Sequence, residues 1–139
     1  MRSRHMSVAD VPLHGESNVA LVLIVDDSPT EVHVMQKALE QHGFSTAAAA
    51  DGTEALSKAR ELHPDLILMD IVMPGVNGFQ ATRQLAADPR TRSIPVIMVT
   101  SKAQESDRVW GLRQGAVDYI VKPFSMDKLV QKAQAALAG

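Results

Sequence analysis

The sequence predicts an α/β fold in which five short strands alternate with five helices. Two observations predict it. Apolar runs typical of buried strands recur along the chain, and a segment with the apolar spacing of a helix follows each of them. Such alternation gives a parallel sheet covered by helices on both faces. Because crossovers are right-handed, few topologies remain, and we expect a doubly wound sheet in the flavodoxin-like order 2-1-3-4-5.

Four of the five predicted strands are strongly apolar. Residues 19–25 read VALVLIV, the continuous run expected of a strand buried on both faces. Residues 44–50 form a weaker strand, because alanine is a poor strand former. The other strands are expected at residues 65–70, 94–100 and 116–122.

The predicted helices have recognisable start and stop residues. Ser28 is a suitable N-cap, Pro29 suits the first helical position, and Glu31 stands where a capping box needs an acid. Gly43 ends this first helix. The remaining helices are expected after residues 51–52 and at residues 79–87, 105–114 and 126–138. Apolar residues expected to face the sheet from the second and the last helix are Ala55, Leu56, Ala59, Leu62, Leu129, Val130, Ala133 and Leu137.

The composition narrows the class of protein. A chain of 139 residues is long enough for one domain with a sizeable core. Its net charge of -2 gives no general attraction for nucleic acid, and the absence of cysteine excludes disulfide and thiolate chemistry. No apolar run approaches the roughly 18 residues of a membrane span. We therefore expect a cytoplasmic protein that binds neither nucleic acid nor a membrane.

The first eighteen residues differ from the rest of the chain. They show no periodicity, mix Ser, Pro and Gly with charged residues, and lack the apolar centre of a signal peptide. We expect residues 1–18 to be a flexible tail in which residues 1–5 derive from a vector and Met6 is the native start. One folded domain is then expected over residues 19–139.

Polar residues stand at the ends of four predicted strands. Asp26 and Asp27 follow the first strand, Asp70 ends the third, Thr100 the fourth and Lys122 the fifth. In a doubly wound sheet, ligands bind outside the carboxyl ends of the strands. Each residue alone has an ordinary explanation, such as helix capping, turn formation, strand propensity or a surface lysine. None of these explanations predicts all five at one edge.

The predicted cluster has a definite chemistry. Three neighbouring carboxylates repel one another unless they are protonated or neutralised. Mg²⁺ prefers oxygen ligands and often combines one or two carboxylates with a phosphate, so we expect Mg²⁺ as cofactor. A carboxylate held there can attack a phosphoryl group and form an acyl phosphate. Lys122 can then neutralise the phosphoryl oxygens, and Thr100 can donate a hydrogen bond to one of them.

Four motifs in order resemble those of CheY-like response-regulator receiver domains, over residues 20–139. They read IVDDS, DLILMDIVMPGVNGFQ, PVIMVTSK and DYIVKPF. The stretches MPGVNGFQATRQL and VWGLRQGA are further similar to regulators of the chemosensory systems that control twitching motility by type IV pili.

The resemblance implies roles for the acidic residues. Asp70 would be the phosphoacceptor. Asp27 and Asp70 would bind Mg²⁺ directly, Asp26 would act through water, and the backbone carbonyl of Val72 would be a further ligand. The aliphatic side chain of Val72 cannot orient an attacking water, which favours slow self-dephosphorylation.

It also implies roles for the other strand-end residues. Lys122 would pair with the phosphoryl group, and the peptide bond between Lys122 and Pro123 would be cis. Thr100 would be the switch hydroxyl and Tyr119 the switch aromatic that moves inward. Lys102, like Val72, would influence how long the phosphoryl group lasts.

The implied function is that of a stand-alone response regulator, not an enzyme. A CheA-like histidine kinase would phosphorylate it, and a face made by the fourth helix, fifth strand and fifth helix would contact an unknown protein target. We expect a monomer that could dimerise on phosphorylation. Trp110 in the fourth helix is either a core-edge aromatic or a partner contact on that face.

Three alternatives remain. The chain could act as a phosphate sink in the same pathway. A phosphohydrolase of the haloacid-dehalogenase type is disfavoured, because its nucleophile follows the first strand and has a second aspartate two residues on, where this chain has Val72 after Asp70. A flavodoxin-like FMN binder is disfavoured because the segment after the first strand, DDSPT, is acidic.

Overall fold

The structure is a computed structural model that describes residues 19–139, so the expectations for residues 1–18 lie outside it. Five parallel strands form one sheet in the order β2-β1-β3-β4-β5, which confirms the predicted topology. The strands are β1 (Leu21–Val25), β2 (Ser45–Ala49), β3 (Leu66–Met69), β4 (Val96–Thr100) and β5 (Asp118–Val121). The helices are α1 (Pro29–Gln41), α2 (Gly52–Leu62), α3 (Gly78–Ala87), α4 (Glu105–Gln114) and α5 (Met126–Ala138).

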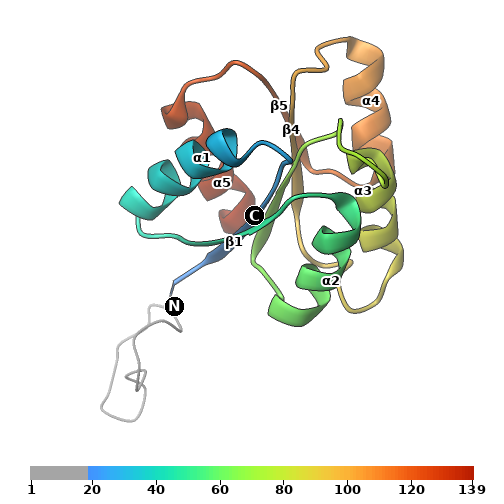
Figure 1. The fold of residues 1–139 in the computed structure, drawn as a ribbon, viewed down its shortest axis with the longest axis horizontal. Coiled ribbons are helices and arrows are strands. Elements are labelled where there is room, and N and C mark those ends of the chain that lie inside the picture. Colours follow the sequence, from blue (N-terminus) through green and yellow to red (C-terminus); the bar gives the residue numbers. More distant parts are fainter. Residues whose placement is uncertain (1–18) are drawn as a thin grey trace.

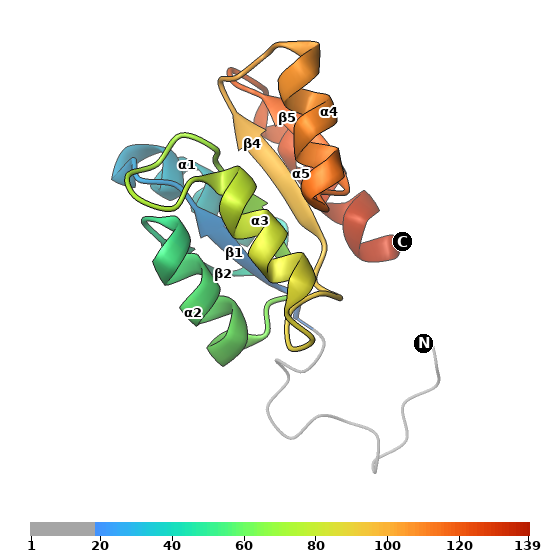
Figure 2. The same cartoon turned by 90° about the vertical axis from the view of Figure 1, so that its right-hand side faces the viewer.

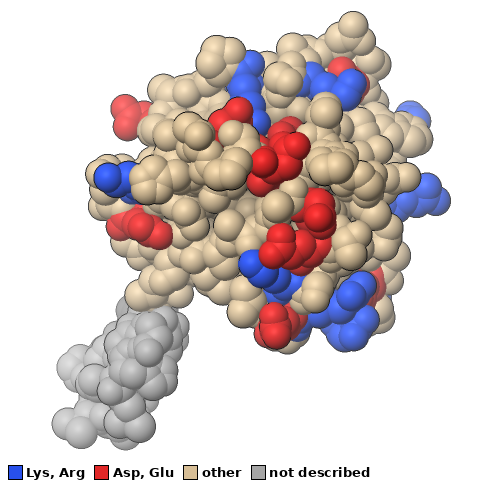
Figure 3. Space-filling model, viewed as in Figure 1, with Lys and Arg blue, Asp and Glu red and all other residues tan. Residues whose placement is uncertain are grey.

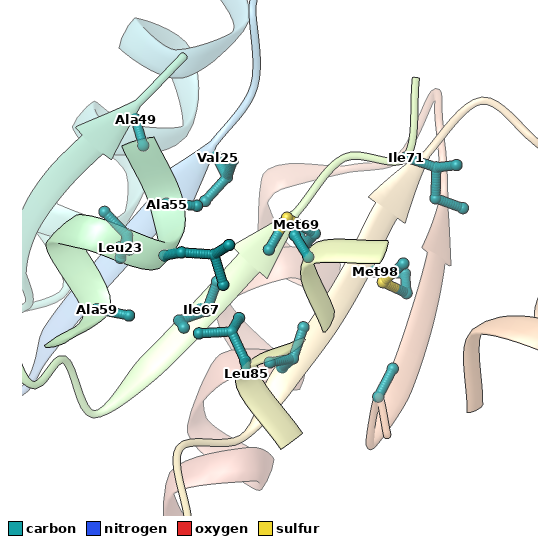
Figure 4. Close-up of a cluster of buried hydrophobic side chains, with 14 of the residues drawn as sticks. Leu23, Val25, Ala49, Ala55, Ala59, Ile67, Met69, Ile71, Leu85 and Met98 are labelled. Atoms are coloured by element: carbon teal, nitrogen blue, oxygen red, sulfur yellow. The ribbon is translucent and has the colours of Figure 1, made fainter. Parts of the chain in front are cut away.

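The sheet lies between two layers of helices. Helices α1 and α5 cover one face, and α2, α3 and α4 cover the other (Figure 1, Figure 2). Alternate residues of β1 enter the two cores: Leu23 and Val25 pack with α2 and α3, whereas Val22 and Ile24 pack with α1 and α5. Figure 4 shows the first of these cores, where side chains of the helices meet those of β1, β3 and β4. The continuous apolar runs of the strands are therefore explained by burial on both faces.

The register of the sheet decides which strand ends meet. Val25 of β1 pairs with Met69 of β3, so the next residues, Asp26 and Asp70, emerge side by side. On the other side of the sheet Thr100 pairs with Val121, which places Lys122 at the same edge.

Some predicted boundaries and burial assignments were wrong. The strands are shorter than predicted: the polar residues Asp65 and Asp70 lie outside β3, and β4 begins after Pro95, which has no N–H to donate to the sheet. Leu62 is 40% exposed, because α2 ends at this residue and the chain turns away through His63 in the left-handed conformation. Leu137 is partly buried and packs against the core beneath α1 and α5, as predicted.

Within residues 19–139, no helix combines the length and the apolar character that crossing a bilayer requires.

Candidate functional site

The ends of β1 and β3 bring three carboxylates together. Asp26, Asp27 and Asp70 each offer an oxygen that lies within 4.8 Å of the others. Asp26 and Asp70 are buried, whereas Asp27 is exposed. Figure 3 shows acidic side chains gathered near the middle of the face on which β1 ends. The predicted cluster of acids therefore exists in the fold.

Backbone N–H groups orient the two buried carboxylates. Oδ1 of Asp26 accepts a hydrogen bond from the N–H of Ser28 (2.9 Å), which ties it to the start of α1. Oδ1 of Asp70 accepts one from the N–H of Ile71 (2.7 Å). The second oxygen of each carboxylate contacts Lys122, so both side chains have defined orientations.

Lys122 places its ammonium group among acidic side chains. Its Nζ donates to Oδ2 of Asp26 at 2.8 Å and to Oδ2 of Asp70 at 3.4 Å, and it forms an ion pair with Glu31. The peptide bond between Lys122 and Pro123 is cis, as the resemblance implies. Lys122, which follows β5, thus supplies a positive charge that partly neutralises the negative charge of the acidic cluster.

The pKa values of the paired groups are shifted. Burial raises the pKa of the Asp70 carboxyl above its usual range; the Lys122 charge opposes this, and the Asp26 charge adds to it. Burial alone would lower the pKa of the Lys122 ammonium, but its hydrogen bonds to Asp26 and Glu31 outweigh burial and raise it. Lys122 is therefore charged at physiological pH, whereas burial disfavours the charged form of Asp70.

Thr100 and Tyr119 lie on the β4–β5 side of the site. Thr100 is fully buried at the end of β4, and its hydroxyl accepts a hydrogen bond from the N–H of Lys102 (3.4 Å). Tyr119 is also buried, and its hydroxyl donates to the backbone carbonyl of Lys102 (2.7 Å). Burial raises the pKa of Tyr119 to about 12, so this hydroxyl stays protonated and can donate. Through these hydrogen bonds to the backbone of Lys102, both residues restrain the loop that joins β4 to α4.

The loop between β3 and α3 holds Val72 and closes on itself. The N–H of Gly78 donates to the carbonyl of Ile71 (2.9 Å), so both ends of the loop meet next to Asp70. Val72 is 58% exposed, so it does not pack in the core. Its roles as a carbonyl ligand and in phosphoryl lifetime stay predictions.

Sequence reasoning missed one residue of the site. Glu31 was predicted to complete a capping box with Ser28. Its N–H does donate to Oγ of Ser28 (3.3 Å), but its carboxylate pairs with Lys122. The capping pattern around Glu31 does not indicate this ion pair, because its partner, Lys122, lies near the other end of the sequence.

The comparisons with known proteins agree with this geometry. The sequence profile described as the response regulator receiver domain matches residues 22–134. The chain belongs to this family.

Other receiver domains resemble this one in sequence. Protein PilH of Pseudomonas aeruginosa is 54% identical over 121 residues, which are 87% of this chain and 100% of PilH. The DNA-binding response regulator MtrA of Mycobacterium tuberculosis is 43% identical over 116 residues, 84% of this chain, and the chain spans only 50% of MtrA.

Solved receiver structures share the fold. The chemotaxis response regulator CheY4 of Vibrio cholerae has a TM-score of 0.81 and 32% identity, covering 86% of this chain and 100% of that chain. The receiver domain of the sensor histidine kinase PA1611 from Pseudomonas aeruginosa, solved with a magnesium ion coordinated in its active site cleft, also has a TM-score of 0.81. It is 32% identical, covering 87% of this chain and 99% of that one.

The donor set of this receiver domain fits a hard divalent cation. All three candidate side chains are carboxylates, and the exposed Asp27 leaves the cluster open to solvent on one side. Mg²⁺ favours such oxygen donors and keeps several water ligands, which an open side permits.

Proposed function

We propose that this receiver domain accepts a phosphoryl group on Asp70 from a histidine kinase. The observation that carries the proposal is the cluster itself: one buried carboxylate at the end of β3, two more at the end of β1, and the Lys122 ammonium in contact with Asp26 and Asp70. Asp26, Asp27, Asp70 and the Val72 carbonyl would hold Mg²⁺, which supplies positive charge beside the transferred phosphoryl oxygens.

The transfer needs no further group of the chain as acid or base. An oxygen of the Asp70 carboxylate attacks phosphorus, a P–O bond forms, and the P–N bond to the kinase histidine breaks. The histidine nitrogen leaves with the bonding electron pair. Lys122 stays charged and lies 3.4 Å from Asp70, so it is placed to balance the phosphoryl oxygens.

The output would run through α4, β5 and α5. A phosphoryl group on Asp70 would attract the Thr100 hydroxyl, and Thr100 is linked to Tyr119 through the backbone of Lys102. This would shift a two-state equilibrium of the β4–α4 loop. Trp110 is 48% exposed on α4, which favours a partner contact over a core-edge position.

The proposal also names the signalling pathway in which this receiver domain acts. The likeness to PilH and the motif wording support a cytoplasmic regulator of type IV pilus twitching motility, phosphorylated by a CheA-like kinase and acting on a protein target. The protein would be a monomer that could dimerise when phosphorylated, and it would dephosphorylate itself slowly. A phosphate sink is the second candidate. It predicts rapid transfer from the kinase and no partner that selects the phosphorylated form.

The deciding experiment exposes the protein to beryllofluoride, a phosphoryl mimic, with and without Mg²⁺. Wild type should change its Trp110 fluorescence or its NMR spectrum only when Mg²⁺ is present, and Asp70→Asn should not respond. Asp127→Asn, which changes an exposed acid on α5, is the matched control and should respond as wild type does. A wild-type protein that binds neither Mg²⁺ nor beryllofluoride would refute the proposed function.

A further inference from the structure

Three carboxylates surround the Lys122 ammonium. Asp26 and Asp70 accept hydrogen bonds from it, and Glu31 forms an ion pair with it. An ammonium group has only three N–H donors. The cation assigned above to phosphoryl recognition is therefore fully engaged, and it must give up a contact before it can turn toward new oxygens on Asp70.

The exposures of the three acids indicate which contact is given up. The side chain of Asp26 is 2% exposed, and a buried carboxylate that loses its cation is strongly destabilised. The side chain of Glu31 is 49% exposed, so water can solvate it, and ion pairs at such positions are weak. Asp70 would itself carry the phosphoryl group. Glu31 is thus the partner that Lys122 can leave most easily.

Glu31 combines a backbone held in a helix with a side chain that borders an open pocket. Its backbone is fixed in the first turn of α1, where Ser28 caps the helix. Beside it lies an open, mostly apolar pocket of about 270 Å³ between α1 and the start of α5, which Val34 and Phe124 help to line. The carboxylate can swing away from Lys122 without any change in the helix.

We propose that Glu31 is a positioning residue that holds Lys122 in the unphosphorylated protein and competes with the phosphoryl group for it. The inference rests on the proposed function and adds a residue that sets how strongly phosphorylation is favoured. Loss of the Glu31 charge would free one donor of Lys122, and the phosphorylated state would gain stability.

The test measures the beryllofluoride concentration at half-saturation, at saturating Mg²⁺, from the Trp110 fluorescence or NMR change. Glu31→Gln and Glu31→Ala should each lower this concentration by about two- to five-fold, the range expected for loss of a partly exposed ion pair. Glu61→Gln is the matched control: it removes the same charge from an exposed position on α2 that forms no ion pair within residues 19–139.

The outcomes separate the inference from the proposed function. Tighter binding by both Glu31 variants, with Glu61→Gln unchanged, supports the competition. Equal half-saturation for wild type and Glu31→Gln would overturn the inference while leaving the proposed function intact, as would an equal shift in Glu61→Gln. A wild-type protein that shows no beryllofluoride response would overturn both.

Discussion

The backbone of Gly78 lies against the backbone of Asp70. A Cβ atom on Gly78 would overlap the carbonyl oxygen of Asp70 and lie 2.7 Å from the Cα of Ile71. Gly78→Ala should therefore push apart the two ends of the β3–α3 loop. We expect a loss of about 1–3 kcal/mol in the free energy of unfolding, as for other overpacked sites, and weaker beryllofluoride binding because Asp70 moves. Urea denaturation measures the first effect.

Gly139→Ala is the control for Gly78→Ala, since a Cβ atom there would meet its nearest neighbour at an ordinary 3.6 Å. It should leave stability unchanged. If Gly78→Ala were as stable as wild type, the close approach of the two backbones would be refuted.

The buried charge of Asp70 gives a second prediction, on pH. The folded state raises the pKa of Asp70, so the contribution of this residue to stability is full below its unfolded pKa of about 4 and is lost as pH rises through the folded value. Asp70→Asn resembles the protonated form and avoids this loss. Without Mg²⁺, it should be more stable than wild type at pH 7, with a higher Tm, and the difference should shrink toward pH 4.

Thermal unfolding in EDTA at several pH values checks this prediction. Adding Mg²⁺ should reverse the order, because the ion binds and stabilises only the protein that keeps its acidic cluster. A wild type that is the more stable protein at pH 7 in EDTA would contradict the pKa shift.

The core of this site could be predicted because it follows from strand ends. Once β1 and β3 are neighbours in a parallel sheet, Asp26 and Asp70 must meet, and apolar runs alone indicate where those strands end. The Glu31–Lys122 pair could not be predicted, because it depends on the path of the β5–α5 loop. The exposure of Trp110 could not be predicted either, because α4 has no clear apolar face and Gly111 is its one buried residue.

The hydrogen bond from Tyr119 to the Lys102 carbonyl gives a third prediction. Tyr119→Phe keeps the buried ring and removes only the hydroxyl, so we expect a loss of about 0.5–1.5 kcal/mol in the free energy of unfolding. Amide hydrogen exchange in the loop after β4 should become faster, because this bond fastens the loop. Tyr119→Ala, which also removes the ring from the core, should cost several-fold more. Unchanged exchange in Tyr119→Phe would show that the bond does not restrain the loop.

The exposure of Trp110 gives the last prediction. Because nearly half of this side chain is exposed, Trp110→Ala should lower the free energy of unfolding by less than about 1 kcal/mol. Leu129→Ala, at a fully buried position of α5, should lower it by about 2–5 kcal/mol and is the reference for a core residue. If α4 contributes to the output face, Trp110→Ala should also weaken binding of the phosphorylated protein to its target by ten-fold or more, as at other tryptophan hot spots. A large loss of stability with unchanged target affinity would instead assign Trp110 to the core.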